Sequence, residues 1–110
     1  MEITPKRIGG TLEILLKGEL DHHSARRVIP EIGSIIDLEL PMRLILDFSG
    51  IGFMDSSGIA VVIGSYKKVF SSGGEFEVVN VPKQAYKVFS AAGICKLIKI
   101  TKQDKQALSV

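Results

Sequence analysis

The sequence predicts a single α/β domain with a mixed, mostly parallel β-sheet of about five strands and about four helices. From Arg43 onward, segments of strand character alternate with helical patterns, which is typical of parallel strands joined by helical crossovers. Near the N-terminus, only Gly9-Gly10 separates two strand patterns, which indicates an antiparallel hairpin at one sheet edge. A chain of 110 residues is long enough to bury one hydrophobic core.

The first two strands form the predicted edge hairpin. Glu2–Ile8 has a weak strand pattern that contains Pro5, and a proline, which cannot donate to a sheet ladder, is tolerated mainly on an edge strand. Thr11–Lys17 is the clearer strand, because its apolar residues recur at every second position. We therefore expect Glu2–Ile8 to lie outermost.

A helix is predicted after Asp21, which can accept backbone N–H bonds as the N-cap. The apolar residues that follow have helical spacing: Ala25, Val28, Ile29, Ile32, Ile35 and Ile36. Pro30 removes a backbone donor and Gly33 lowers helix propensity, so a kink or a late start is expected in this region. Pro41 ends the segment before the next strand.

The segment Arg43–Phe70 is predicted to form a central strand, a turn and a helix. Arg43–Phe48 is almost entirely apolar, which is typical of a strand covered on both faces in a parallel sheet. Gly50-Ile51-Gly52 forms the turn in this interpretation, Asp55 is the N-cap, and Gly73-Gly74 ends the helix. Binding sites in such sheets gather at the carboxyl ends of strands, so this turn is the candidate site.

The helical phase predicts which residues of this helix face outward. At about 100° per residue, one side carries the residues expected to pack on the sheet: Ile59, Val62, Ile63, Tyr66 and Phe70. The opposite side is expected to form an outward-facing stripe of Ser57, Val61, Gly64 and Lys68. Ser56 falls on the flank of the buried side, so Ser57 is the serine expected to be accessible.

Two further strands and two helices are predicted in the C-terminal part. Glu75–Val81 has a strand pattern, Pro82 opens a helix, and Gly93 suits the position just after its end. Leu97–Ile100 is a short last strand. The capping-box pattern of Thr101–Asp104 indicates a short terminal helix.

Charge and composition argue against several classes of protein. The 14 basic residues barely exceed the 12 acidic ones and are scattered, which argues against a nucleic-acid-binding protein. Met1 is not followed by an apolar signal segment, and no apolar run approaches the roughly 18 residues of a membrane span, so a cytoplasmic protein is expected. The single cysteine, Cys95, is expected to be a buried thiol without a chemical role.

Three chemical interpretations of the candidate site are weaker than a simple turn. Gly50-Ile51-Gly52 begins a dinucleotide motif, but Asp55 replaces the third glycine and would repel a pyrophosphate. The residues around Ser57 do not form GxSxG and no histidine follows it, so the hydrolase order cannot be built. His22 or His23 could approach from the other strand end, but an unrelated triad is not expected in so small a domain. The side chains of Asp21-His22-His23 diverge on a helix and converge badly on one metal ion.

A resemblance to a known family is carried by three segments: LILDFSGIGFMDSSGIAVVIGSYKKV, GELDHHSA and VFSAAGICKLIKI. Together they resemble the STAS domain of bacterial anti-sigma factor antagonists, with most similarity to those that act on the sporulation anti-sigma F factor. The resemblance covers nearly the whole chain, and DSSG combined with GELDHH is specific. Pro30 departs from the usual pattern of the first helix in this family.

The resemblance implies partner switching. The unmodified protein would bind the anti-sigma factor, itself a serine protein kinase, and so release the sigma factor. Phosphorylation of Ser57 would end that binding, and a PP2C-like metal-dependent phosphatase would reverse it. The protein would then be a binder and substrate rather than an enzyme, monomeric when free, without a cofactor and without direct contact to nucleic acid or membrane. The residues expected at the partner contact are Asp21, His22, Met54, Asp55, Ser56, Ser57, Gly58, Val61, Gly64 and Lys68.

Two other classes of function stay open beside this one. The first is an enzyme or nucleotide-binding module that uses the turn of Gly50–Gly58. The second is a STAS domain with a transport or stress-complex partner, against which GELDHH and the free-standing chain of 110 residues argue.

Overall fold

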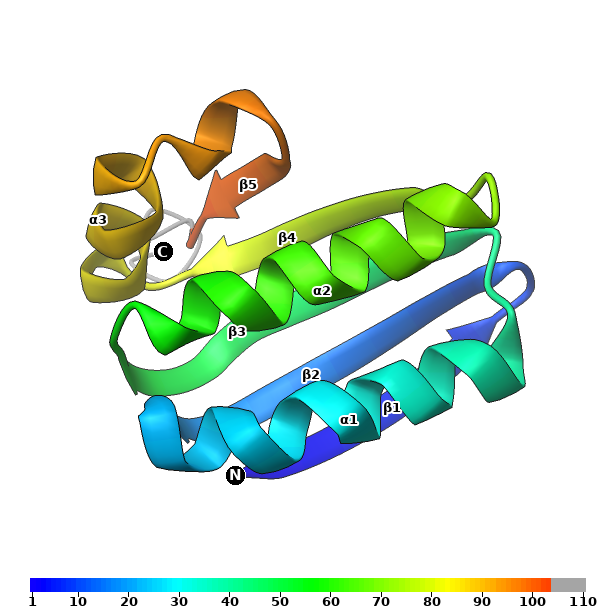
Figure 1. Cartoon of the computed structure of the whole chain (residues 1–110), viewed down its shortest axis with the longest axis horizontal. Helices are drawn as coiled ribbons and strands as arrows, with labels where there is room; N and C mark the ends of the chain where they lie inside the picture. The colour runs from blue at the N-terminus through cyan, green and yellow to red at the C-terminus, as the bar shows by residue number, and fades with distance from the viewer. Residues whose placement is uncertain (104–110) are drawn as a thin grey trace, which may run out of the picture.

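The computed structural model describes residues 1–103, which form a five-stranded sheet and three α-helices (Figure 1). The elements in chain order are β1 Glu2–Ile8, β2 Thr11–Leu20, α1 His22–Glu39, β3 Arg43–Met54, α2 Ser57–Ser71, β4 Glu75–Val81, α3 Lys83–Ala91, a 3₁₀ turn η1 Ile94–Lys96, and β5 Lys99–Lys102. The predicted α/β class and mixed five-stranded sheet are confirmed. The expectation of about four helices is wrong for the described residues: Thr101 and Lys102 lie in β5, and the part of the predicted terminal helix from residue 104 onward lies outside them.

The strands lie side by side in the order β1-β2-β3-β4-β5, and only the pair β1 and β2 is antiparallel. Ile8 pairs with Thr11, so Gly9-Gly10 forms the whole turn of the predicted hairpin. Gly9 has φ of 61°, a conformation that glycine adopts without strain. Pro5 lies on the edge strand β1, as expected.

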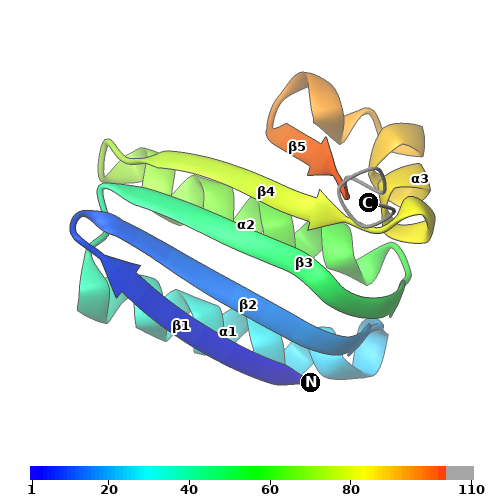
Figure 2. The ribbon, with the colours of Figure 1, turned by 180° about the vertical axis from the view of Figure 1, so that it is seen from behind.

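This strand order places α1 and α2 on the same face of the sheet. Each crossover from β2 onward advances one strand in the same direction, and crossovers of one hand then leave their helices on one side. Figure 1 shows α1 and α2 side by side over the sheet, and Figure 2 shows the opposite face uncovered by them.

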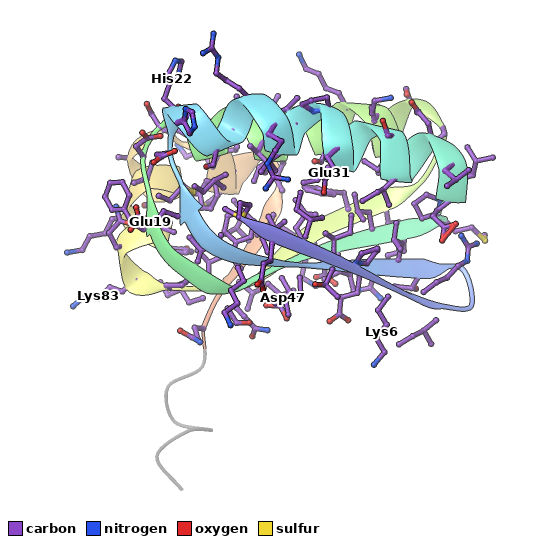
Figure 3. The ribbon with its side chains drawn as sticks, turned by 90° about the horizontal axis from the view of Figure 1, so that it is seen from below. Lys6, Glu19, His22, Glu31, Asp47 and Lys83 are labelled. Carbon is purple, nitrogen blue, oxygen red and sulfur yellow. The ribbon has the colours of Figure 1, made fainter. Side chains whose placement is uncertain are left out.

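The predicted burial of Arg43–Phe48 on both faces is therefore wrong. Leu44, Leu46 and Phe48 are fully buried beneath the helices, whereas Ile45 and Asp47 alternate with them and stay partly exposed. In Figure 3, Lys6 and Asp47 point from the sheet away from α1. The strand is central but has only one fully covered face.

A single core fills the space between the sheet and the helices. Its almost completely buried side chains include Leu12, Ile14, Leu16, Leu44, Leu46 and Val78 from the strands and Val28, Ile32, Val62 and Val69 from α1 and α2. The Phe48 and Phe89 rings, 5.7 Å apart between centroids, join α3 to this core. Every buried side-chain nitrogen or oxygen in residues 1–103 has a hydrogen-bond partner.

Helix α1 starts at His22 and continues through Pro30 to Glu39, so the late start considered above is wrong. Pro30 is exposed, and solvent can satisfy the carbonyl group that a proline leaves without an N–H partner. Leu40 then adopts a left-handed conformation with φ of 45°, and its N–H donates to the Ile36 carbonyl. No helix in the part of the chain that the structure describes is long and apolar enough to cross a membrane.

Strand β3 runs on to Met54, so Gly50-Ile51-Gly52 is not a turn, contrary to the prediction. Strand β2 also continues to Leu20, and the two strands stay paired through two register shifts. A Cβ atom on Gly50 would lie 2.7 Å from the carbonyl oxygen of Leu16. The glycine is needed for this close approach of two strands rather than for a change of direction.

The last elements are displaced from their predicted positions. The 3₁₀ turn η1 follows Gly93, which has the left-handed φ of 73° expected after a helix end. Strand β5 consequently spans Lys99–Lys102 rather than Leu97–Ile100. Cys95 lies in η1 and is partly exposed rather than buried.

Candidate functional site

The candidate site lies where β2 and β3 end and the N-termini of α1 and α2 begin. Asp21 follows β2, Asp55 and Ser56 follow β3, and α3 starts nearby after β4. Figure 3 shows Glu19, His22 and Lys83 at this one end of the molecule. The expected gathering of helix N-termini at the carboxyl ends of the strands is therefore observed.

Asp21 is the N-cap of α1, as predicted. Its Oδ1 accepts a 2.9 Å hydrogen bond from the Ser24 backbone N–H, while its own N–H donates to Ser24 Oγ at 3.1 Å. This is a capping box in which a serine takes the place of the usual glutamate. The Ser24 backbone N–H is the main cause that lowers the pKa of Asp21 below its ordinary value of 3.8.

Asp55 connects the N-termini of α1 and α2. Its Oδ1 accepts from the Ser57 N–H at 2.8 Å, and its Oδ2 accepts from the His22 N–H at 3.2 Å. The N-cap position itself belongs to Ser56, so the predicted cap is one residue off. The Ser56 side chain makes no cap bond, and the carboxylate one residue earlier serves the helix start instead.

The two serines differ in exposure in the opposite sense from the prediction. Ser56 is exposed, whereas Ser57, the first residue of α2, is partly buried. The first N–H groups of the helix already have acceptors: Gly58 N–H donates to the Asp55 carbonyl and Ile59 N–H to the Ser56 carbonyl, both at 3.1 Å. A phosphate on Ser57 would therefore lie at the positive end of the helix dipole. The N–H groups of Gly58 and Ile59 would not be free to bind it, because they already donate to carbonyl groups.

The predicted outward stripe of α2 is wrong at Val61. Val61 is 1% exposed, whereas Phe70, expected to be buried, is 64% exposed. The buried sector is rotated because α2 packs on α1 as well as on the sheet, which also buries Ser65. Lys68 extends along the same side to Asp37 of α1, with a 2.7 Å ion pair. At Lys68 the supposed outer stripe therefore faces α1, whereas Gly64 of the same stripe has open space at its Cα.

Two other residues expected at the partner contact support the turn from beneath. Met54 is fully buried, and Gly58 is buried against it. A Cβ atom on Gly58 would lie 2.3 Å from Met54 Sδ, so this contact requires glycine. Gly64 is partly exposed with open space at its Cα. The members of the predicted set that retain exposed surface are Asp21, His22, Asp55, Ser56, Ser57, Gly64 and Lys68.

Sequence analysis missed two residues at this end. Gln84 of α3 makes two hydrogen bonds with the Met54 backbone: its Oε1 accepts from the Met54 N–H at 2.9 Å, and its Nε2 donates to the Met54 carbonyl at 2.8 Å. Phe53 is a large aromatic residue with 43% exposure directly before the turn. The sequence could have indicated Phe53, because an aromatic residue at the end of a strand is a recognisable feature. Nothing in the sequence indicates that Gln84 of α3 reaches the end of β3.

Two surface hollows are relevant to the position of the serines. One of about 780 Å³ lies at the other end of the sheet beside Gly10, Pro41 and Gly74. Beside Ser56 there is an open hollow of about 590 Å³ between α2 and α3. Residues 1–103 contain no group of three or more His, Cys, Asp or Glu side chains placed to hold a metal ion.

Comparison with known proteins agrees with this architecture. The family model described as the STAS domain matches residues 2–107. An anti-sigma F factor antagonist from Paenibacillus polymyxa is 30% identical over 109 residues, which are 99% of this chain and 93% of the relative. The similarity therefore extends along both proteins.

Two solved structures of the anti-sigma factor antagonist SpoIIAA are similar at 26% sequence identity. The unphosphorylated form has a TM-score of 0.77, with 97% of this chain and 93% of that chain covered. The phosphorylated form, from Bacillus, has a TM-score of 0.69, with 98% and 97% covered. By sequence and by fold, the chain belongs to the STAS domain family and, within it, to the anti-sigma factor antagonists.

Proposed function

We propose that the unmodified chain binds an anti-sigma factor with serine kinase activity in the cytoplasm, and that phosphorylation of Ser57 ends this binding. The observation that carries the proposal is the position of Ser57, partly exposed at the start of α2, where Asp55 also secures the start of α1. The relative from Paenibacillus polymyxa, similar over 109 residues, is an anti-sigma F factor antagonist. Release of a sigma factor follows when the antagonist occupies its inhibitor, and a metal-dependent phosphatase would restore the binding form.

Phosphorylation acts locally in this proposal. A phosphate carries about −1.5 to −2 charges, which the positive end of α2 stabilises by roughly 0.3 to 1 kcal/mol. The Asp55 carboxylate, which accepts the N–H of the same serine, opposes this gain by repulsion. The two effects oppose each other, so the net change in stability should be small and the fold should survive. SpoIIAA, solved in both phosphorylated and unphosphorylated forms, supports this expectation for a chain of this fold.

The effect on binding is larger than the effect on folding. A dianion pressed into a partner surface without a matching cation loses hydration at a cost of several kcal/mol, and about every 1.4 kcal/mol lowers affinity tenfold. Affinity for the anti-sigma factor should therefore fall by orders of magnitude. The chain is a substrate of the kinase and phosphatase and supplies no catalytic group of its own in this proposal.

The test is incubation of the chain with its purified anti-sigma factor and ATP, followed by mass spectrometry to locate the phosphate. We expect it on Ser57, and we expect Ser57→Ala to bind without being modified and Ser57→Asp to bind poorly. Ser56→Ala is the matched control, because it removes a neighbouring and more exposed hydroxyl. Modification that persists in Ser57→Ala and is lost in Ser56→Ala would contradict the proposal.

A further inference from the structure

Large apolar side chains are exposed at the end of the molecule opposite the serines. The three most exposed ones in residues 1–103 are Leu38 at 81%, Met42 at 75% and Leu40 at 70%, and Ile8 is 60% exposed. They belong to the last turn of α1, the loop from α1 to β3, and the end of β1. Figure 1 shows the end of α1 and the turn between β1 and β2 at the same end of the molecule. We call these four residues the terminal patch.

Hydrogen bonds hold the segments of the terminal patch together. The Met42 N–H donates to the Gly10 carbonyl at 2.9 Å, so the loop after α1 lies on the turn between β1 and β2. Arg7 Nη1 donates to the Glu39 carbonyl at 2.6 Å, which joins β1 to the end of α1. Leu40 and Met42 line the same open hollow of about 780 Å³. These apolar side chains are therefore gathered on one surface rather than scattered singly.

Leu40 is unusual in conformation as well as in exposure. It ends α1 with a left-handed φ of 45°, at a helix end where glycine is common because it has no Cβ atom. A leucine in this conformation is strained, and its exposed side chain gains little burial in return. Glycine would serve the fold at least as well, so the leucine side chain indicates a contact outside the chain.

The charges around the terminal patch are of both signs. Arg7 and Glu39 lie together at the end of α1, and Arg43 and Glu75 both line the open hollow. The Glu39 and Glu75 carboxylates form no ion pair within residues 1–103. A strongly acidic or strongly basic partner would therefore meet like charges, whereas a second copy of the chain would bring both signs to the contact.

We propose that the terminal patch binds the same patch of a second copy of this chain and forms a weak two-fold dimer. A two-fold contact pairs each residue twice, so Arg7 of one copy would lie opposite Glu39 of the other, and the reverse. In the hydrogen bonds of residues 1–103, Arg7 uses only Nε and Nη1, so its Nη2 remains available for this carboxylate. The apolar side chains would fill the centre of the contact.

The size of the terminal patch fits a weak dimer. From the size and exposure of its four side chains, it offers roughly 200 to 350 Å² of apolar surface per copy. Apolar groups make up about 56 to 65% of an interface, so the dimer would bury on the order of 600 to 1,200 Å² in total. This is the range of weak and transient contacts. The dimer should therefore form at high protein concentration and modifies the monomeric free state expected from the family resemblance.

The dependence of mass on concentration tests the dimer. In sedimentation equilibrium from about 1 µM to about 1 mM, the mass should rise from 12.0 kDa toward twice that value. Leu38→Lys/Met42→Lys should weaken association about tenfold or more. The control Ile29→Lys/Leu97→Lys adds the same charge at two exposed apolar residues outside the patch and should change association much less. Circular dichroism melting checks that both variants stay folded. A constant mass of 12.0 kDa, or equal effects of the two variants, would overturn the dimer.

An exchange of charges tests the two-fold arrangement. Arg7→Glu would place carboxylates opposite each other in a homodimer, and Glu39→Arg would do the same with guanidinium groups. Each variant alone should therefore associate about tenfold more weakly. An equimolar mixture of the two should regain the wild-type association, because every contact then joins a carboxylate to a guanidinium group. A mixture that associates no better than its components would refute the two-fold contact.

This inference does not depend on the proposed function. Helix α2 separates Ser57 from the terminal patch by roughly 20 Å, so both serines of a dimer stay accessible. Leu38→Lys/Met42→Lys should accordingly still bind the anti-sigma factor and be phosphorylated on Ser57. A dimer that forms in a chain that does not bind the anti-sigma factor would refute the proposed function alone. Loss of anti-sigma factor binding in Leu38→Lys/Met42→Lys would assign the patch to that partner and overturn the second copy as its occupant.

Discussion

Substitution of Val61 by glutamate should strongly destabilise the fold, because this residue lies in the core rather than on the surface. Val61 is 1% exposed and lies on the side of α2 that packs on the sheet and α1. Burial of a valine side chain contributes about 1.5 to 3 kcal/mol, which Val61→Glu loses. A buried carboxyl group without a partner adds roughly 1 to 3 kcal/mol even when it is neutral.

The expected loss in free energy of unfolding is therefore about 2.5 to 6 kcal/mol, out of the roughly 5 to 15 kcal/mol typical of a domain. This corresponds to a fall in Tm of about 10 °C or more, since 1 kcal/mol shifts a small domain by at least roughly 4 °C. Circular dichroism melting and urea denaturation measure both quantities.

Phe70→Glu is the matched control, because it introduces the same residue into the same helix. Phe70 is 64% exposed, and its ring lies 5.5 Å from that of Tyr66. Loss of this ring pair costs about 0.5 to 1.5 kcal/mol. Helical phase read from the sequence predicts the reverse ranking of the two variants. A Val61→Glu protein that melts with the wild type, together with a collapsed Phe70→Glu protein, would refute the packing described above.

Three further predictions concern the turn and its supports. Gly58→Ala should lower the free energy of unfolding by about 1 to 3 kcal/mol, because its Cβ would lie 2.3 Å from Met54 Sδ. Gly64→Ala should raise it by roughly 0.5 to 1 kcal/mol, because this helix position is open. Equal stabilities of the two variants in urea denaturation would contradict this prediction. Gln84→Met should lower the free energy of unfolding by about 1 to 3 kcal/mol and speed amide exchange at Met54, because both hydrogen bonds to the Met54 backbone are removed. Unchanged exchange at Met54 would show that these bonds do not hold the turn. A backbone hydrogen bond holds the pKa of Asp21 below 3.8, so its stabilising effect is complete above that pH and lost as pH falls through the lower folded value. Wild-type protein should thus lose stability relative to Asp21→Asn as pH falls below 3.8, and parallel stability curves would exclude a charged cap.

The sequence was sufficient for the elements whose signals are local. Asp21 caps α1 because a carboxylate and a serine three residues later can exchange hydrogen bonds within one turn. Gly9-Gly10 makes the hairpin, and Pro5 lies on the edge, because backbone conformation and a missing N–H donor act at single residues. The start of α2 near Ser57 was predicted for the same reason, although the turn before it was expected at Gly50-Ile51-Gly52, where β3 still continues.

Tertiary structure alone decided which faces are buried. Helical periodicity gives the angle between two side chains of α2 but not how many neighbours the helix has. The strand order puts α1 and α2 on one face of the sheet, so α2 is buried over a wider sector that includes Val61 and leaves Phe70 outside. Contacts between distant segments also could not be predicted from the sequence. The Asp55 carboxylate accepts from the His22 N–H, and the Gln84 side chain bonds to the Met54 backbone. These contacts form because separate crossovers bring their ends together at one edge of the sheet.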